Sequence, residues 1–365
     1  MDLRPRHDGM SHRATSANGR TLRILMVMDP DIAVPPKHYG GIERVIADLS
    51  REYASRGHEV TLCAGPGSEG PGAVWTFGRS GPNSRARVAR NVFRVAVRLL
   101  RDAQHFDVVH NFGRLAYLGS ILRNPIRKVH TYMRRVDPAK VRLAQRLGAK
   151  ALSFVAVSKA IARTAGAAGE DWAVVPTCAS VARYVPGYAV DFRSAPLAFL
   201  GRLERCKGAH TAIKVARALD RTLLIAGNVS DLPEEKIYFE TELKPNIDGR
   251  QIRYLGPVDD VAKNNLLAGC AALLSPVEWL EPFPVTIPEA LLCGAPVIAL
   301  NRGGMAEGIA QGVTGFVCES FEELVEAVGK LPQIDRRECR RIGEARFSVA
   351  AVADSYEALY RDTTG

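Results

Sequence analysis

Short runs of apolar residues recur along the whole chain and alternate with longer amphipathic segments. LRILMVM at 22–28, LAFLGRL at 197–203 and PVIAL at 296–300 contain few polar residues. Strands that are buried on both faces have this pattern, whereas half-exposed strands alternate apolar and polar residues. Helical periodicity lies between the runs, for example at 42–56 and 207–219. The alternation of strands and helices therefore predicts an α/β protein with parallel sheets.

A segment rich in turn residues interrupts this alternation once, at residues 182–196 (ARYVPGYAVDFRSAP). We place the linker between two domains there, with an N-terminal domain over residues 21–185 and a C-terminal domain over residues 190–345. In open parallel sheets, ligands bind beyond the carboxyl ends of the strands, so two such domains leave a cleft for a ligand. Residues 1–20 are polar, and we expect a disordered leader there.

The composition narrows the class of protein and of partner. A hydrophobic content of 47% excludes disorder as the main state, and no stretch approaches the roughly 20 apolar residues of a membrane helix. The seven cysteines are scattered and never form a C-x-x-C pair, which favours reduced thiols in a cytoplasmic protein over a disulfide framework or a zinc site. The net charge of +10 suits an anionic partner, whether a nucleotide, a nucleic acid or an acidic membrane surface.

The loop after the first predicted strand is the first candidate site. It is rich in proline and ends in Gly40 and Gly41, just before a helix predicted from Ile42. A glycine pair at a helix N-terminus lets backbone amides approach an anion or a sugar closely, although a plain loop-to-helix turn explains the pair equally well. Asp29 and Asp31 in the same loop fit a divalent-metal site or, more simply, the exit of a strand.

A second candidate loop follows the strand predicted to end at Gly201. Arg202 and Lys207 lie in this loop, and a helix is predicted to begin after Gly208. Arg grips phosphate oxygens in a bidentate way, Lys adds a point charge, and a helix end adds N–H donors, so the loop suits a diphosphate. The alternative is that both cations are ordinary loop residues of a basic protein.

The third candidate loop contains two glutamates, Glu281 and Glu289, within residues 278–300 (EWLEPFPVTIPEALLCGAPVIAL). Pro282 and Pro284 prevent a single helix from carrying both carboxylates. Glu281 is therefore predicted to lie in the loop, and Glu289 in the first turn or so of the helix that follows. A structural alternative for Glu289 is a favourable interaction with the helix dipole.

Four blocks of the sequence together resemble one family. They are YGGIERVIADLSREYASRGHEVTL, FLGRLERCKG, EPFPVTIPEALLCGAPVIAL and GGMAEGIAQGVTGFVCE, which fall in order within residues 22–320. They look like the signatures of glycosyltransferase family 4 (glycosyl transferases group 1), whose members are retaining enzymes. The E-x7-E spacing is specific here because G-R-x4-K-G precedes it and C-G-x-P-V-I follows it.

The resemblance implies the GT-B fold, an α/β architecture in which two Rossmann-like domains with parallel sheets face a central cleft. The N-terminal domain would bind the acceptor, and the C-terminal domain would bind the nucleotide-sugar donor. The last helix, within residues 346–365, would cross back onto the N-terminal domain.

The resemblance also implies a set of donor-binding residues, which comprises Gly40, Gly41, Arg202, Lys207, Val258, Glu281, Phe283, Pro284, Val285, Thr286 and Glu289. Arg202 and Lys207 would hold the diphosphate. Glu289 would accept hydrogen bonds from the ribose, and Glu281 would contact the donor sugar. Backbone amides near Phe283 would face the sugar and the β-phosphate. The family often has Gly where this chain has Pro284, so one amide donor is missing there.

The implied reaction moves a sugar from a nucleotide-diphosphate sugar, with UDP as the expected nucleotide, to a hydroxyl of a glycan, a lipid-linked acceptor or a small molecule. Arg202 and Lys207 would stabilise the departing diphosphate, so we expect no metal ion and no other cofactor. The acceptor would attack the face that the diphosphate leaves, without a covalent enzyme intermediate.

Two rival functions are an epimerase or phosphorylase on the same fold, and a non-catalytic binder of nucleotides or nucleic acid. We expect no nucleic-acid partner, because a diphosphate explains the cations at 202–207 better.

The acceptor side departs from the family pattern. His110 matches the first His of a common HxH motif and is a further catalytic candidate facing the donor sugar, but Phe112 replaces the second His. A lone His at a strand end is as often structural. Met133 stands where many relatives have His, and PTCAS at 176–180 replaces a common Pro-Asn-Gly turn.

A basic helix is predicted over residues 85–103, with six arginines on one face and Val88, Val92, Val95 and Leu99 on the other. One interpretation is that it docks on an anionic membrane, which would make the protein peripheral on the inner face of the membrane. The other, which we favour, is that its apolar face packs on the N-terminal sheet while the basic face is solvated.

Overall fold

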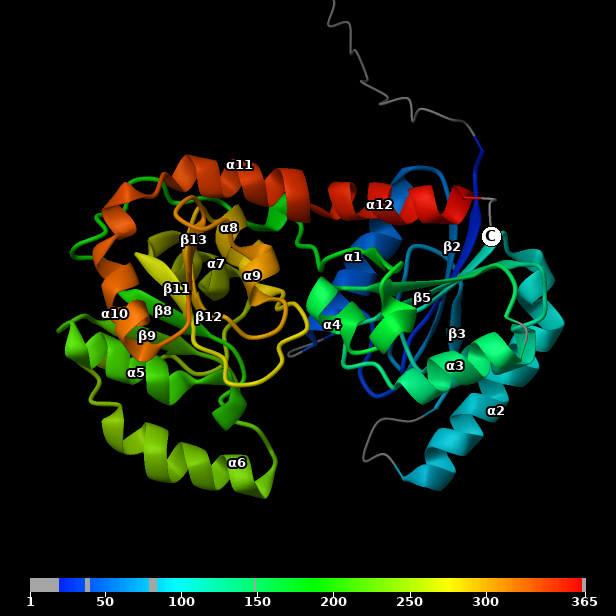
Figure 1. Cartoon of the computed structure of the whole chain (residues 1–365), viewed down its shortest axis with the longest axis horizontal. Coiled ribbons are helices and arrows are strands. Elements are labelled where there is room, and N and C mark those ends of the chain that lie inside the picture. Colours follow the sequence, from blue (N-terminus) through cyan, green and yellow to red (C-terminus); the bar gives the residue numbers. More distant parts are fainter. Residues whose placement is uncertain (1–19, 37–39, 79–83, 148, 363–365) are drawn as a thin grey trace, which may run out of the picture.

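The computed structural model describes residues 20–36, 40–78, 84–147 and 149–362. Two lobes lie side by side, and each contains one parallel sheet between helices (Figure 1). Residues 1–19, which make up nearly all of the expected leader, lie outside the described residues.

The N-terminal sheet has seven strands in the order β3-β2-β1-β4-β5-β6-β7, and all of its pairs are parallel. Its central strands are the continuous apolar runs that predicted burial on both faces. The strands are β1 (Arg23–Val27), β2 (Glu59–Ala64), β3 (Val74–Thr76), β4 (Val108–Asn111), β5 (Arg127–Tyr132), β6 (Leu152–Ala156) and β7 (Ala173–Val174). The helices are α1 (Gly41–Ser55), α2 (Arg85–Asp102), α3 (Pro138–Arg146) and α4 (Lys159–Arg163).

The C-terminal sheet has six parallel strands in the order β10-β9-β8-β11-β12-β13. The strands are β8 (Leu197–Leu200), β9 (Leu223–Ala226), β10 (Ile252–Tyr254), β11 (Ala272–Ser275), β12 (Val297–Leu300) and β13 (Gly315–Cys318). The helices that follow β8 along the chain are α5 (Ala209–Ala218), α6 (Pro233–Tyr238), α7 (Asp260–Gly269), α8 (Thr286–Leu292), α9 (Met305–Gly308), α10 (Phe321–Gly329), α11 (Arg336–Phe347) and α12 (Val349–Arg361). In both sheets the strand order reverses beside the first strand, which is where α/β sheets bind ligands.

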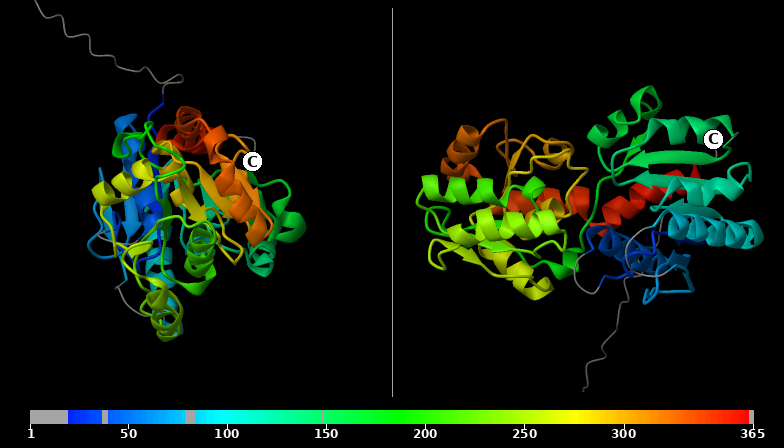
Figure 2. Two further views of the ribbon diagram at one scale, coloured as in Figure 1. Left: turned by 90° about the vertical axis from the view of Figure 1, so that its left-hand side faces the viewer. Right: turned by 90° about the horizontal axis from the view of Figure 1, so that it is seen from below.

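The chain passes between the two lobes twice. The first passage includes residues 182–196, which form no strand and contain only the end of a short 3-10 turn. The second lies between α11 and α12, which run end to end along both lobes (Figures 1 and 2). Because α12 buries Tyr356 and Tyr360 against α1 and β5, the C-terminal helix packs on the N-terminal lobe.

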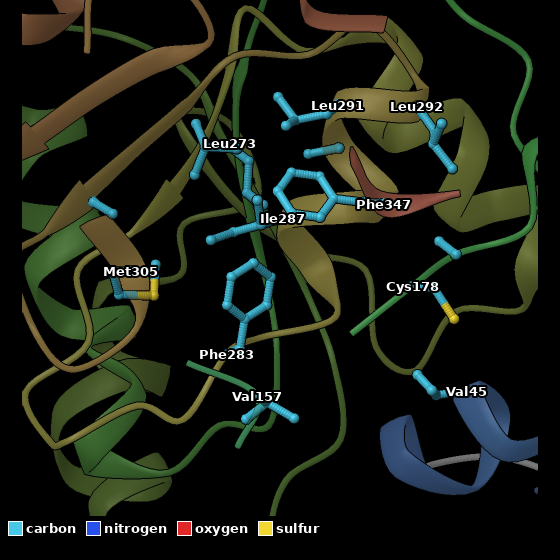
Figure 3. Close-up of a cluster of buried hydrophobic side chains, with 14 of the residues drawn as sticks. Val45, Val157, Cys178, Leu273, Phe283, Ile287, Leu291, Leu292, Met305 and Phe347 are labelled. Carbon is cyan, nitrogen blue, oxygen red and sulfur yellow. The ribbon is translucent and has the colours of Figure 1, made fainter. Parts of the chain in front are cut away.

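Apolar packing continues from one lobe into the other below the cleft. Phe283 lies between Ile287 of α8 and Val157, which follows β6 (Figure 3). The ring of Phe283 also meets Phe347 at the end of α11, with 5.6 Å between the ring centroids. All of these side chains are at most 5% exposed. The loop that carries Glu281 is therefore held by core packing at the interface between the lobes.

The basic helix α2 packs on the sheet with the face that the sequence predicted. Val95 and Leu99 are buried against the 3-10 segment η2 (Leu115–Ile121), while Val88 and Val92 are partly buried. Within the described residues, no helix is both long enough and apolar enough to cross a membrane.

Candidate active site

A cleft of about 960 Å³ lies between the two lobes, at the carboxyl ends of both sheets. Every residue of the predicted donor-binding set lines it. The N-terminal lobe contributes the start of α1, and the C-terminal lobe contributes the loops after β8 and β11 and the start of α8. Loops that are far apart in sequence converge there because parallel strands bring all their carboxyl ends to one edge.

The loop after β8 depends on a glycine. Gly208 has φ +78° and is the N-cap of α5, directly after Lys207. A Cβ at this position would lie 2.0 Å from the carbonyl oxygen of Pro276, so no other residue fits without moving the backbone. This tight passage places Lys207 and Arg202 at the wall of the cleft.

Lys207 and Glu281 form an ion pair, with 2.6 Å between Nζ and Oε2. Trp279 donates its indole N–H to the same oxygen at 2.6 Å, and the Lys207 ammonium lies 4.8 Å from the centre of the Trp279 ring. Glu281 is only 5% exposed, so these two partners satisfy a nearly buried carboxylate. Arg202 is paired in a similar way with Glu204. Both predicted diphosphate ligands thus contact carboxylates in this structure.

The turn that contains Gly303 and Gly304 contacts the backbone of the Glu281 loop. Gly304 donates its N–H to the carbonyl of Glu281 at 2.7 Å. Gly303 has φ +64°, and a Cβ there would lie 2.1 Å from the same carbonyl oxygen. The turn between β12 and α9 therefore sets the position of Glu281.

Glu289 lies in the first turn of α8, as the proline pattern predicted. Two donors converge on its Oε1 atom: Lys263 Nζ at 2.5 Å and the Tyr184 hydroxyl at 2.7 Å. Burial, and then the charge of Glu289, raise the pKa of Tyr184 well above its ordinary value, so this hydroxyl remains a donor.

Lys263, Tyr184 and Trp279 were not identified as site residues from the sequence. Tyr184 lies in the aperiodic linker and Lys263 within an ordinary helix, so only three-dimensional contact identifies them.

The two lobes are joined at the side of the cleft by an ionic cluster centred on Asp260. Arg44 of α1 contacts both oxygens of Asp260, at 2.9 and 2.8 Å. Arg183 and Lys263 lie 3.3 and 3.6 Å from the same carboxylate. Burial alone would raise the pKa of Asp260, but the charges of Lys263, Arg44 and Arg183 hold it below its ordinary value. The start of α1 approaches closely, since a Cβ on Gly41 would lie 3.3 Å from a methyl group of Val285.

His110 does not line the cleft. It is fully buried at the end of β4, where Nδ1 contacts the Tyr360 hydroxyl at 2.6 Å and Nε2 contacts the Thr131 hydroxyl at 2.8 Å. Its ring lies against Phe112, with 3.8 Å between centroids. Burial lowers the pKa of His110 well below its ordinary value, so the ring is neutral. The structure therefore contradicts the placement of His110 at the donor sugar, because α12 covers it and both ring nitrogens are used in packing.

Asp29 and Asp31 each form an ion pair with an arginine. Asp29 contacts Arg134 at 2.8 Å, and Asp31 contacts Arg87 at 3.1 Å. Among the described residues, no group of three or more His, Cys, Asp and Glu side chains is arranged to hold a metal ion. Glu43 in the first turn of α1 also lines this wall, and burial raises its pKa.

Two family models match the chain. The model for glycosyl transferases group 1 matches residues 193–347, and the model for glycosyltransferase family 4 matches residues 39–183. A mouse α-1,3/1,6-mannosyltransferase, ALG2, is 32% identical over 152 residues, which are 39% of this chain and 36% of that protein. Matches to the first curated relatives thus span about a third to a half of those proteins.

Solved structures resemble the chain over nearly its whole length. AviGT4, a glycosyltransferase involved in avilamycin A biosynthesis, is 25% identical with a TM-score of 0.68, covering 93% of this chain and 97% of that one. HepE from Anabaena, solved in complex with UDP and glucose, is 21% identical with a TM-score of 0.70, covering 93% of this chain and 100% of that one. The likeness to HepE concerns the fold, with two parallel-sheet lobes.

Proposed function

Because the chain belongs to the group 1 glycosyltransferases of family 4 and has the GT-B fold that its sequence implied, we propose that it moves a sugar from a nucleotide-diphosphate sugar to a hydroxyl acceptor. The observation that carries the proposal is the convergence of Arg202, Lys207, Glu281 and Glu289 on one cleft between the lobes. Glycosyl transfer is therefore favoured over the epimerase, the phosphorylase and the non-catalytic binder.

Arg202 and Lys207 hold the diphosphate in this proposal. A diphosphate carries more negative charge than a carboxylate and offers more acceptor oxygens, so it competes with Glu281 for the Lys207 ammonium. Glu281 keeps the Trp279 indole N–H as a partner and becomes available to a sugar hydroxyl. In this proposal, donor binding therefore replaces the ion pair between Lys207 and Glu281.

Glu289 accepts hydrogen bonds from the ribose. Lys263 and Tyr184 both donate to its Oε1 atom and so fix the rotamer of this carboxylate. We propose UDP as the nucleotide. The HepE structure of the same fold is described in complex with UDP and glucose.

The chemistry follows from where charge develops. Breaking the bond to the sugar puts negative charge on the departing diphosphate, and cations preorganised in a partly enclosed cleft lower that barrier. Arg202 and Lys207 supply positive charge, so the proposed mechanism uses no metal ion and no other cofactor. The acceptor hydroxyl attacks the face that the diphosphate leaves and gives its proton to an oxygen of the departing diphosphate, which retains the anomeric configuration without a covalent intermediate.

The test is sugar transfer with a panel of UDP-, GDP- and ADP-sugars, with nucleotide release and product anomer as readouts. Lys207→Ala and Glu289→Ala should each lower release about a hundredfold or more while their circular dichroism spectra stay native. Arg142→Ala, an exposed arginine on α3, is the matched control. Wild-type turnover in both site variants contradicts the assignment of the site. A dependence on inorganic phosphate or an epimerised donor as product supports a rival function.

The outer face of α2 supports a location at a membrane surface. Phe93, Val97 and Leu100 are 69%, 48% and 66% exposed and follow one stripe of the helix, between exposed arginines. Apolar side chains flanked by cations suit the interface of an anionic bilayer. We propose that the protein is cytoplasmic and binds such a surface peripherally through α2.

Co-sedimentation with phosphatidylglycerol vesicles tests this location. Binding should fall with added salt, and Phe93→Ser with Leu100→Ser should weaken it. Leu232→Ser, at an apolar residue of the other lobe that is 50% exposed, should not. Equal binding of all three proteins, or none by the wild type, contradicts the proposal.

A further inference from the structure

Three arginines gather at the carboxyl edge of the N-terminal sheet, outside the set assigned to the donor. Arg114 follows β4, Arg134 follows β5, and Arg87 lies in the first turn of α2. They meet Asp29 and Asp31, which follow β1. This edge is where an open parallel sheet binds its ligand.

A buried carboxylate fixes two of these guanidinium groups. Asp29 is 8% exposed and contacts Arg134 Nη2 at 2.8 Å and Arg114 Nε at 3.7 Å. The Tyr117 hydroxyl donates to Asp29 at 2.9 Å and fixes the carboxylate in turn. The Arg134 side chain is nevertheless 56% exposed, and that of Arg114 is 34% exposed. A guanidinium has five N–H donors, so each keeps donors directed away from Asp29.

The charge of the edge is positive. Three arginines share two aspartates, and Arg135, next to Arg134, is exposed as well. Glu43 is a further acidic group near this cluster, and burial raises its pKa. An anion placed against the outer side of Arg134 therefore meets net positive charge.

The edge lies beside residues of the N-terminal lobe that line the cleft. Arg134 directly follows Met133, and both Met133 and Glu43 line the cleft. Ile32, which directly follows Asp31, lines the cleft as well, and the charges of Asp29, Arg134 and Asp31 act on Glu43. Lys207 and Arg202 line the wall of the other lobe.

We propose that Arg134 and Arg114, held by Asp29, bind an anionic group of the acceptor, either a phosphate or a carboxylate. Arg pairs with both groups in a planar, bidentate geometry, and a guanidinium that is already oriented loses little entropy on binding. The acceptor is then an anionic molecule whose hydroxyl points toward the donor sugar. This inference rests on the proposed function, since only a transferase has an acceptor.

Calorimetric titration with inorganic phosphate and, separately, with malonate tests the site. The background variant is Arg202→Ala with Lys207→Ala, which removes the proposed diphosphate site. Phosphate or malonate should still bind to this background, and the tighter of the two identifies the chemistry of the acceptor. Adding Arg134→Ala or Arg114→Ala should weaken binding about tenfold or more, because a charge-assisted pair is lost. Adding Arg142→Ala, on α3, should leave it unchanged.

Absence of binding to the background variant at millimolar anion overturns the inference, as does equal affinity with and without Arg134. Because two variants each lack a different arginine, misfolding of one variant does not decide the outcome of the test. Donor turnover, measured separately, distinguishes the two proposals. If Arg134→Ala loses anion binding but the wild type turns over no nucleotide sugar, the anion site stands and the transferase proposal fails.

Discussion

Arg44 of α1 and Asp260 of α7 form an ion pair that joins the two lobes at the side of the cleft. Arg44 Nη1 lies 2.9 and 2.8 Å from the two carboxylate oxygens. Asp260 in turn lies 3.6 Å from Lys263, which holds Glu289. A chain of charges thus links the start of α1 to the proposed ribose ligand, so we expect donor binding to depend on this contact between the lobes.

We expect Arg44→Ala and Asp260→Asn each to raise the KM for the donor more than they lower kcat, because they loosen the closed arrangement without touching the reacting atoms. Both side chains are partly exposed, so the pair should contribute only about 0.5–1 kcal/mol to stability. A double-mutant cycle in urea unfolding measures this coupling. The exposed pair of Lys244 and Glu240, both within the C-terminal lobe, is the control. Additive effects of the Arg44 and Asp260 substitutions would show that the lobes do not depend on this contact.

Lys263→Met should reduce discrimination between ribose and deoxyribose nucleotides. Lys263 orients Glu289, and a hydrogen bond to a charged group contributes about 1.5–3 kcal/mol. The wild type should therefore prefer UDP over 2′-deoxy-UDP by about tenfold or more, and the variant should lose most of that preference. Competitive inhibition by the two nucleotides gives the ratio.

Lys214→Met, at an exposed lysine of α5, controls for loss of charge alone. An unchanged ratio in Lys263→Met would contradict the positioning role. A merely structural lysine would change stability and leave the ratio intact.

Trp279→Phe separates the sugar contact from the diphosphate contact. The substitution removes the indole N–H that lies 2.6 Å from Glu281, while Lys207 remains. We expect kcat to fall about tenfold, since one hydrogen bond that orients Glu281 is lost. Lys207→Ala should cost about a hundredfold or more, as for loss of a group that stabilises developing charge. Similar losses in the two variants would mean that Lys207 serves mainly to hold Glu281.

The positions of Glu281 and Glu289 could be predicted because they depend on prolines that are near them in sequence. Pro282 and Pro284 force Glu281 out of any helix, and the structure indeed places Glu281 in the loop and Glu289 in α8. Trp279 and Lys263 could not be predicted, since nothing in their own neighbourhood in sequence shows which carboxylate they reach. His110 was assigned by a motif match alone, and the helix that covers it lies some 250 residues away in sequence. Contacts set by packing between distant elements are beyond local reasoning.

Replacing His110 tests both its structural role and the pH dependence of stability. Burial lowers the pKa of His110 well below its ordinary value and that of His130 to about 3, so both rings are neutral when folded. In the unfolded chain each takes up a proton as the pH falls through about 6.5. The unfolded state then binds more protons than the folded state, so stability is lost as the pH falls below that value, by about 1.4 kcal/mol per pH unit for each ring.

His110→Gln should therefore lower stability at pH 7, through loss of the contacts with Tyr360 and Thr131, and should make the decline between pH 6 and about 4.5 shallower by about one proton. Urea unfolding at several pH values gives both quantities. The kcat of the folded variant should stay within about threefold of the wild type, because the ring lies under α12 and outside the cleft. A hundredfold loss of kcat with native stability would restore His110 to the chemistry, and an unchanged slope would mean that the ring is not neutral in the folded protein.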